Sequence, residues 1–301
     1  MRIYLTICLA VGLSALLPGC KDDSATVNVQ DVTTPFLPGS ADDSEEAQLR
    51  REFYSTYGSF LLFNDTLQHY ETGRDVNGEM RYFTELLDLT YEVGMSSYTN
   101  SKYTFTLLTG MEEKRAAVAY LQENLLPHLT GKLRPYSWLL VDKITRDFNG
   151  NISSPYAASG QRAVAVACNV LPRLKNESQK ATYTRNVMNV VINKLTTDNE
   201  QAFDEFFRVS AAYYDGTFTD PKTTAANTAI LNEAGFICRG QELGRDVNGL
   251  YPSQSLDLNA FARLVTGNTS ETIATRYAQY PLVVQKAEIM RRILTDLGYK
   301  E

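Results

Sequence analysis

The sequence predicts an α+β protein with a small sheet and a mainly helical C-terminal half. Two observations support this fold class. Short runs rich in aromatic or β-branched residues, bounded by Gly, Asn, Pro or charges, all occur before about residue 171. From Glu177 onward, apolar residues recur at helical spacing. No long structureless stretch interrupts residues 45–301, so we expect this region to form one domain.

Each element has its own local signal. Ser44, followed by Glu45 and Glu46, predicts a helix start, with acids at the positive end of a helix that runs to Tyr57. Apolar residues four apart predict a second helix over 111–126. We expect strands at 59–64, 103–108, 136–144 and 161–171. We expect further helices at about 178–197, 199–213, 224–234, 257–266 and 281–297.

Composition excludes several classes of function. The 301 residues carry 29 Lys and Arg against 35 Asp and Glu, a formal charge of −6, so the net charge exerts no electrostatic pull toward nucleic acid or anionic lipid. The four Cys include no C-x-x-C, and only His69 and His128 could supply imidazole. Most zinc hydrolase designs need two or three His. We expect both His on the surface.

Residues 1–19 have the pattern of an export signal. Arg2 precedes an apolar run from Ile3 to Leu17, which is short for a membrane span. The run ends in Leu17-Pro18-Gly19-Cys20, which resembles the bacterial lipobox. That resemblance implies cleavage before Cys20, acylation of Cys20 and membrane attachment through the lipid. A plain secretory signal with a chance Cys is the alternative.

Residues 20–44 read as a flexible tether, because this stretch rich in Asp, Ser, Thr and Pro cannot bury enough apolar area to offset its ordering entropy. Lys21-Asp22-Asp23 is similar to the surface-export signal of lipoproteins in some gut anaerobes. It favours the cell-surface side of the outer membrane, and a solvated acidic linker is the alternative.

The hexapeptide Gly-Arg-Asp-Val-Asn-Gly occurs at 73–78 and again at 244–249, and residues 146–150 are close to both. Asp-x-Asn-Gly is half of an EF-hand loop, but that loop also needs a bidentate Glu nine residues after the Asp. Thr84, Tyr156 and Ser255 occupy those places. Since Asn-Gly favours tight turns, the sequence predicts three turns.

One predicted helix carries a polar stripe. Val187, Val191 and Leu195 form an apolar face, and Asn189 and Asn193 lie one turn apart beside it. A zincin helix places two His at this spacing, with a Glu after the first as general base. The Asn189–Asn193 segment has the spacing without the reactive groups.

At this point the chain resembles a known family, the zinc metallopeptidase-like lipoproteins of bacterial outer-membrane nutrient-uptake loci. The similarity runs from Phe53-Tyr54-Ser55-Thr56-Tyr57-Gly58, through Phe203-Asp204-Glu205-Phe206 and Gly235-Phe236-Ile237, to the helix containing Lys286. It implies a zincin-like fold with a small mixed sheet. It also implies partners: a TonB-type uptake complex, or a peptide or glycan ligand.

Carried over by position, every reactive group of the family is replaced. Asn189 and Asn193 stand where the family has His, Val190 where it has the Glu base, and Arg263 where it has a third ligand. A neutral amide is a poor substitute for imidazole at Zn²⁺, and Val190 cannot accept a proton. At about 4 Å and an effective dielectric near 20, Arg263 would repel a divalent ion by roughly 8 kcal/mol. The resemblance therefore implies a pseudoenzyme with no metal, no other cofactor and no catalytic residue.

Three functions remain open. The first is a non-catalytic binding or accessory lipoprotein of nutrient uptake, on the cell surface or facing the periplasm. The second is a hydrolase that uses a carboxylate site not visible in the sequence. The acids at 198, 200, 204 and 205 cluster around a helix start, and two of them could serve a glycosidase, but complementarity to the helix dipole explains the cluster more simply. The third is a purely structural surface protein. Cys168 and Cys238 could pair in an oxidising envelope, or Cys168 could be buried and free.

Arg263 has two interpretations. We expect an intramolecular salt bridge, to Glu200 or Glu205. The alternative is that Arg263 faces an open cleft, where it would attract a peptide carboxylate, a sugar acid or an acidic partner loop.

Overall fold

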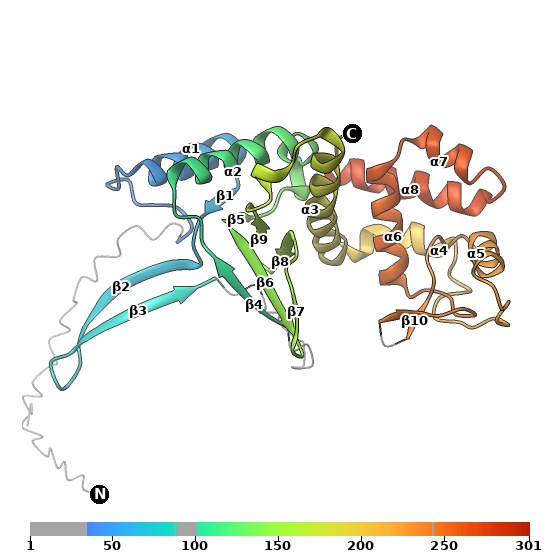
Figure 1. The fold of residues 1–301 in the computed structure, drawn as a ribbon, viewed down its shortest axis with the longest axis horizontal. Helices are drawn as coiled ribbons and strands as arrows, with labels where there is room; N and C mark the ends of the chain where they lie inside the picture. Colours follow the sequence, from blue (N-terminus) through green and yellow to red (C-terminus); the bar gives the residue numbers. More distant parts are fainter. Residues whose placement is uncertain (1–34, 88, 90–100, 243) are drawn as a thin grey trace, which may run out of the picture. The chain divides into compact units, whose positions relative to one another are not determined.

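The computed structural model describes residues 35–87, 89, 101–242 and 244–301. It confirms the predicted α+β class, a small mixed sheet followed by a helical C-terminal half (Figure 1). Cys20 and the signal segment lie outside the described residues. The compact unit begins at Pro35, ten residues before the expected domain start, because Phe36 is buried against Phe60 and its carbonyl accepts a hydrogen bond from Arg50 at 2.9 Å.

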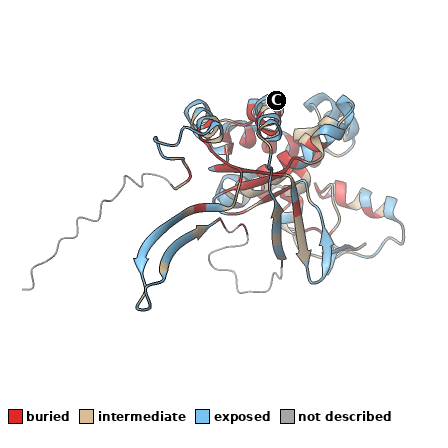
Figure 2. Cartoon of the chain, turned by 60° about the vertical axis from the view of Figure 1, so that its left-hand side comes forward, coloured by how far each residue is buried: buried red, intermediate tan, exposed pale blue. Residues whose placement is uncertain are grey.

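The central sheet has four strands, in the order β1 (Phe60–Leu62), β5 (Ser137–Val141), β9 (Val164–Ala167) and β8 (Ala157–Ser159). The first three are parallel, and the edge strand β8 pairs antiparallel with β9. Every residue of β5 and β9 is buried, as expected for parallel strands covered on both faces (Figure 2).

Two apolar layers cover this sheet. Trp138 and Leu140 pack with the buried faces of α1 (Glu45–Tyr57), α2 (Met111–Asn124) and α3 (Glu177–Asp198). The alternate residues Leu139 and Val141 pack on the other side, with Leu67, Leu89 and Ile144. The alternation of strand side chains explains why adjacent residues serve different layers.

Two antiparallel sheets extend from the second layer: β2 (Thr66–Arg74) with β3 (Met80–Leu86), and β4 (Ser101–Thr106) with β6 (Lys143–Phe148) and β7 (Asn151–Ser153). The β2–β3 hairpin is largely exposed beyond Leu67 (Figure 2).

The predicted turns are confirmed. Gly78 closes the β2–β3 hairpin, Gly150 joins β6 to β7 and Gly249 follows β11, all with φ between 77° and 82°. The Asp75 carboxylate accepts hydrogen bonds from the backbone amides of Asn77 and Glu79, which closes the turn.

Most helices lie where the sequence predicts them, including α3, α5 (Thr224–Glu233), α6 (Gln254–Gly267) and α8 (Pro281–Leu297). The single helix expected over 199–213 is wrong. The structure has the short helices η4 (Glu200–Phe203) and α4 (Asp204–Arg208), followed by turns. In these turns the Ser210 hydroxyl donates a hydrogen bond to the Ala234 carbonyl at 2.8 Å. The structure adds α7 (Ser270–Arg276), which was not predicted. The remaining short elements are η1 (Leu126–His128), η2 (Gly131–Leu133), η3 (Leu171–Arg173), β10 (Gln241–Glu242) and β11 (Arg245–Asp246).

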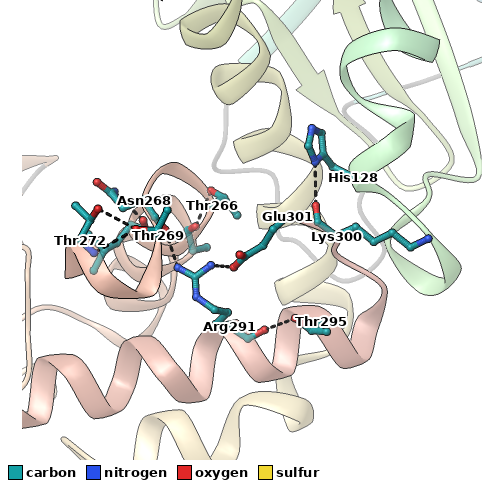
Figure 3. Close-up of polar contacts among 11 residues, drawn as sticks. His128, Thr266, Asn268, Thr269, Thr272, Arg291, Thr295, Lys300 and Glu301 are labelled. Carbon is teal, nitrogen blue, oxygen red and sulfur yellow. Dashed lines mark hydrogen bonds and ion pairs between the residues drawn. The ribbon is translucent and has the colours of Figure 1, made fainter. Parts of the chain in front are cut away.

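The C-terminal residues are fastened to the body of the domain (Figure 3). The backbone amide of Lys300 donates to the His128 carbonyl at 3.0 Å, and the His128 ring contacts the Lys300 carbonyl at 2.9 Å. Arg291 donates to the Asn268 carbonyl at 2.6 Å and also pairs with Glu301. These bonds hold the end of α8 against η1 and the end of α6.

Candidate functional site: the α3 face and the α5–α6 groove

The two asparagines predicted from the sequence lie on α3, one turn apart. Asn189 is 8% exposed, and Asn193 and Val190 are half-buried. The helix packs against the edge strand β8 and against α6. The buried side-chain oxygen of Asn189 has no hydrogen-bond partner among the described residues. This face of α3 offers amide groups and a valine but no imidazole, carboxylate or thiol.

The two His have structural surroundings. His69 is exposed, as expected, and its ring lies 2.9 Å from the Thr84 hydroxyl. His128 is half-buried and bonded to Lys300. Within the described ranges, no three His, Cys, Asp or Glu side chains gather closely enough to hold a metal ion.

Cys168 and Cys238 do not form the disulfide that the sequence left open, and both are free thiols. Cys168 is buried and Cys238 is half-buried. Desolvation raises the pKa of each thiol to about 12, with the Asp142 charge adding to the shift at Cys168 and the Asp257 charge at Cys238. Both are therefore protonated, and poor nucleophiles, at neutral pH.

The expected salt bridge between Arg263 and Glu205 is wrong. Glu205 pairs with Arg292 at 2.5 Å instead, and the side chain of Glu200 lies outside the described part of the structure. Arg263 is exposed on α6, and neither a salt bridge nor a hydrogen bond joins it to a described residue. The pairing with Glu205 is therefore contradicted, and the pairing with Glu200 lies outside the described side chains.

Arg263 opens onto a groove of about 560 Å³ between α5, the β10–β11 segment and α6. We call this the α5–α6 groove. Its described lining is Thr224, Thr228, Leu231, Asn232, Ile237, Cys238, Arg239, Gln241, Asp246, Leu256, Asn259, Ala260 and Arg263. No residue of α3 is among them. The structure thus places Asn189 and Asn193 on α3, and it places Arg263 on the side of α6 that lines the groove.

The helix geometry of α6 explains this placement. Leu256, Asn259, Ala260 and Arg263 follow the i, i+3, i+4, i+7 spacing of one helix face, and they line the groove. Asp257, Phe261 and Leu264 fall on the opposite face and are buried. Helical periodicity places Arg263 away from the core.

A buried polar cluster ties the core face of α6 to α8. Lys286 and Asp257 are both fully buried, and their charged atoms lie 2.5 Å apart. The Lys286 ammonium also donates to Ser210 at 3.2 Å, and the Tyr214 hydroxyl donates to Asp257 at 2.6 Å. The rings of Phe206, Phe236, Phe261 and Tyr214 surround the ammonium, with centroids at 4.5–5.6 Å.

Desolvation raises the pKa of Asp257 and lowers the pKa of Lys286, while the attraction between their charges opposes both shifts. Ser210 is fully buried beside the ammonium, so no substrate could reach it. The cluster holds α6, α8 and the 210–214 turns together, and we assign it no chemistry.

Sequence reasoning named Arg263 but missed Asn232, Arg239 and the Lys286–Asp257 pair. These residues acquire neighbours only when α5, α6 and α8 pack, and no local motif marks them. Lys286 was noticed only as a feature of its helix.

No protein-family model, curated protein or solved structure matches this chain. Over the described ranges, no helix has the length and apolar character needed to cross a bilayer.

Proposed function

We propose that this protein is a non-catalytic, zincin-like outer-membrane lipoprotein that binds a ligand, as an accessory component of nutrient uptake. It is anchored through acylated Cys20 and faces the cell surface or the periplasm. Its ligand is a peptide or a glycan, and it acts alongside an uptake complex of the TonB type.

The proposal depends mainly on the composition of the α3 face. Asn189 and Asn193 have the spacing of a metal-binding pair, on a helix that packs against an antiparallel edge strand and against α6. Neither side chain is a good zinc ligand, and Val190 between them cannot act as a base. Because α3 has the spacing of a metal-binding helix but none of its reactive groups, it supports a binding role rather than hydrolysis.

The unpaired Arg263 adds to this support. An exposed guanidinium that has no acceptor among the described residues, on the wall of a groove, is suited to an external anion. The hydrolase alternative has weaker support. Of the described acids in that cluster, Asp198 and Glu205 are in ion pairs with Lys194 and Arg292, and Asp204 is an exposed acid in the first turn of α4, where it complements the helix dipole.

Three measurements test the proposal. Purified protein, dialysed without chelator, should contain well under one zinc per chain and should leave a casein substrate uncleaved. Cells fed labelled palmitate should incorporate it into the wild type and not into Cys20→Ala. A full equivalent of tightly held zinc, or equal labelling of the two proteins, would refute the corresponding half of the proposal.

A further inference from the structure

We infer that the α5–α6 groove is a binding site for the C-terminal carboxylate of a short peptide, with Arg263 as its anchor. The inference rests on the proposed function, because it chooses between the two ligand classes named there. It assigns the ligand to a surface separate from the α3 face, since no α3 residue lines the groove.

The charge in the groove favours an anion. Three described lining residues carry formal charges: Arg239, Asp246 and Arg263. Arg239 and Asp246 pair at 3.1 Å, so their charges offset each other. Arg263 is left as a local positive charge on a chain whose formal net charge is −6. Its planar guanidinium can donate two parallel hydrogen bonds to one carboxylate.

Asn232 marks the same groove independently. It is 7% exposed and lines the groove, yet its amide side chain forms no hydrogen bond with a described residue. Its amide atoms are not among the fully buried polar atoms that lack a partner, so they remain accessible from the groove that the side chain lines. Its amide can both donate and accept, which matches the N–H and C=O of a peptide group.

The remaining lining residues distinguish a peptide from a sugar. Leu231, Ile237, Leu256 and Ala260 form an apolar part of the groove that can receive an aliphatic side chain. None of the described lining residues is aromatic, so no ring offers a flat face to a sugar. The volume of about 560 Å³ lies within the range of about 300–1,000 Å³ typical of small-ligand sites.

The test uses isothermal titration calorimetry on the purified protein with three probes. The tripeptide Ala-Ala-Leu carries the carboxylate and an aliphatic last residue. Its C-terminal amide keeps the same side chains but is neutral, and an NH2 group replaces one of the two carboxylate oxygens. Digalacturonic acid presents carboxylates on a sugar. We expect the tripeptide to bind, and the amide to bind at least about 10-fold more weakly, as for loss of a charge-assisted hydrogen bond.

Arg263→Gln should weaken tripeptide binding at least about 10-fold, and it should leave the weak binding of the amide unchanged. Arg245→Gln is the matched control: it removes the same charge from an exposed residue of β11 that does not line the groove. It should bind the tripeptide like the wild type. Asn232→Leu should weaken binding and change the melting temperature little, because the amide that it removes has no hydrogen bond with a described residue.

The outcomes separate this inference from the proposed function. Equal affinity for the tripeptide and its amide, or undiminished binding by Arg263→Gln, would overturn the carboxylate site. Binding of digalacturonic acid alone would overturn the peptide assignment and leave a ligand-binding lipoprotein in place. No binding of any probe would also overturn the inference, whereas the proposed function fails through zinc, proteolysis or palmitate labelling.

Discussion

Breaking the buried ion pair between Lys286 and Asp257 should be among the most damaging single changes in the domain. Lys286→Met removes the ammonium and leaves a carboxylate with no exposed surface, whose one remaining side-chain partner among the described residues is the Tyr214 hydroxyl. Asp257→Asn leaves an ammonium enclosed by four aromatic rings and bonded to Ser210. In both cases an uncompensated charge remains in the core.

The structure indicates the size of each effect. Removing one partner of a buried pair costs about 3–5 kcal/mol. Interaction with the aromatic rings, at about 0.5–2 kcal/mol for each ring that faces a cation, should place Asp257→Asn toward the lower end. For a domain of this size, where 1 kcal/mol corresponds to about 2–4 °C, the melting temperature should fall by about 6–20 °C. The double variant should lose clearly less than the sum of the two single losses, since neither unpaired charge remains.

Urea unfolding followed by the fluorescence of Trp138, which is buried in the central sheet, measures all four proteins of this cycle. A loss below about 1 kcal/mol for Lys286→Met would refute the reasoning, because it would mean that Asp257 is readily solvated or neutral without its partner. Fully additive losses would equally show that the two charges do not interact.

The deficit of Lys286→Met should depend on pH. Desolvation already raises the pKa of Asp257 above its ordinary value of 3.8, and the Lys286 charge opposes that shift. Without Lys286 the pKa should rise further. The folded state then binds a proton that the unfolded state lacks, so stability falls as pH rises from about 3.8 through the folded-state pKa. The difference in stability from the wild type should therefore be smaller at pH 5 than at pH 7. A difference that does not change with pH would contradict this account.

Two further predictions compare paired positions. Gly58 and Gly298 both end helices with positive φ, but a Cβ at Gly58 would meet open space, whereas one at Gly298 would overlap the Thr130 carbonyl. Gly58→Ala should cost about 1–2 kcal/mol and Gly298→Ala about 3 kcal/mol or more by urea unfolding, and equal costs would contradict the predicted overlap. Iodoacetamide at pH 7.5 should modify Cys238 slowly, and Cys168 only after unfolding, because both thiols have a pKa of about 12 and Cys168 is the more buried. Mass spectrometry of digested protein checks this, and rapid labelling of Cys168 in the folded state would contradict its burial.

The sequence was most informative where an element carries its own boundaries. The predicted helix 281–297 coincides with α8, because Pro281 starts it and Gly298 ends it with positive φ. The β2–β3 hairpin was missed, and its burial pattern explains why. Beyond Leu67 its residues are mostly exposed on both faces, so no alternation of apolar and polar residues exists to be detected.

The residues of the candidate site also differ in how far the sequence could predict them. Arg263 could be singled out because its position in the chain matched a family pattern. Asn232 and Arg239 could not, since their relevance comes from α5 and the β10–β11 segment meeting α6 around one groove. The salt bridge expected between Arg263 and Glu205 failed because the choice of partner depends on packing: Arg292 on α8 is the cation beside Glu205.

The fastening of the C-terminal residues has a consequence for how the chain folds. Hydrogen bonds join His128 to Lys300 and Thr130 to Gly298, across separations of 172 and 168 residues. Contacts this distant in sequence require a large loop to close, which is entropically costly and tends to slow folding. During synthesis, η1 cannot acquire these bonds until residues 298–300 have been made. We therefore expect the sheet half to complete its packing only after α8 is available, so that the domain folds as one late, cooperative unit rather than from its N-terminal end in stages.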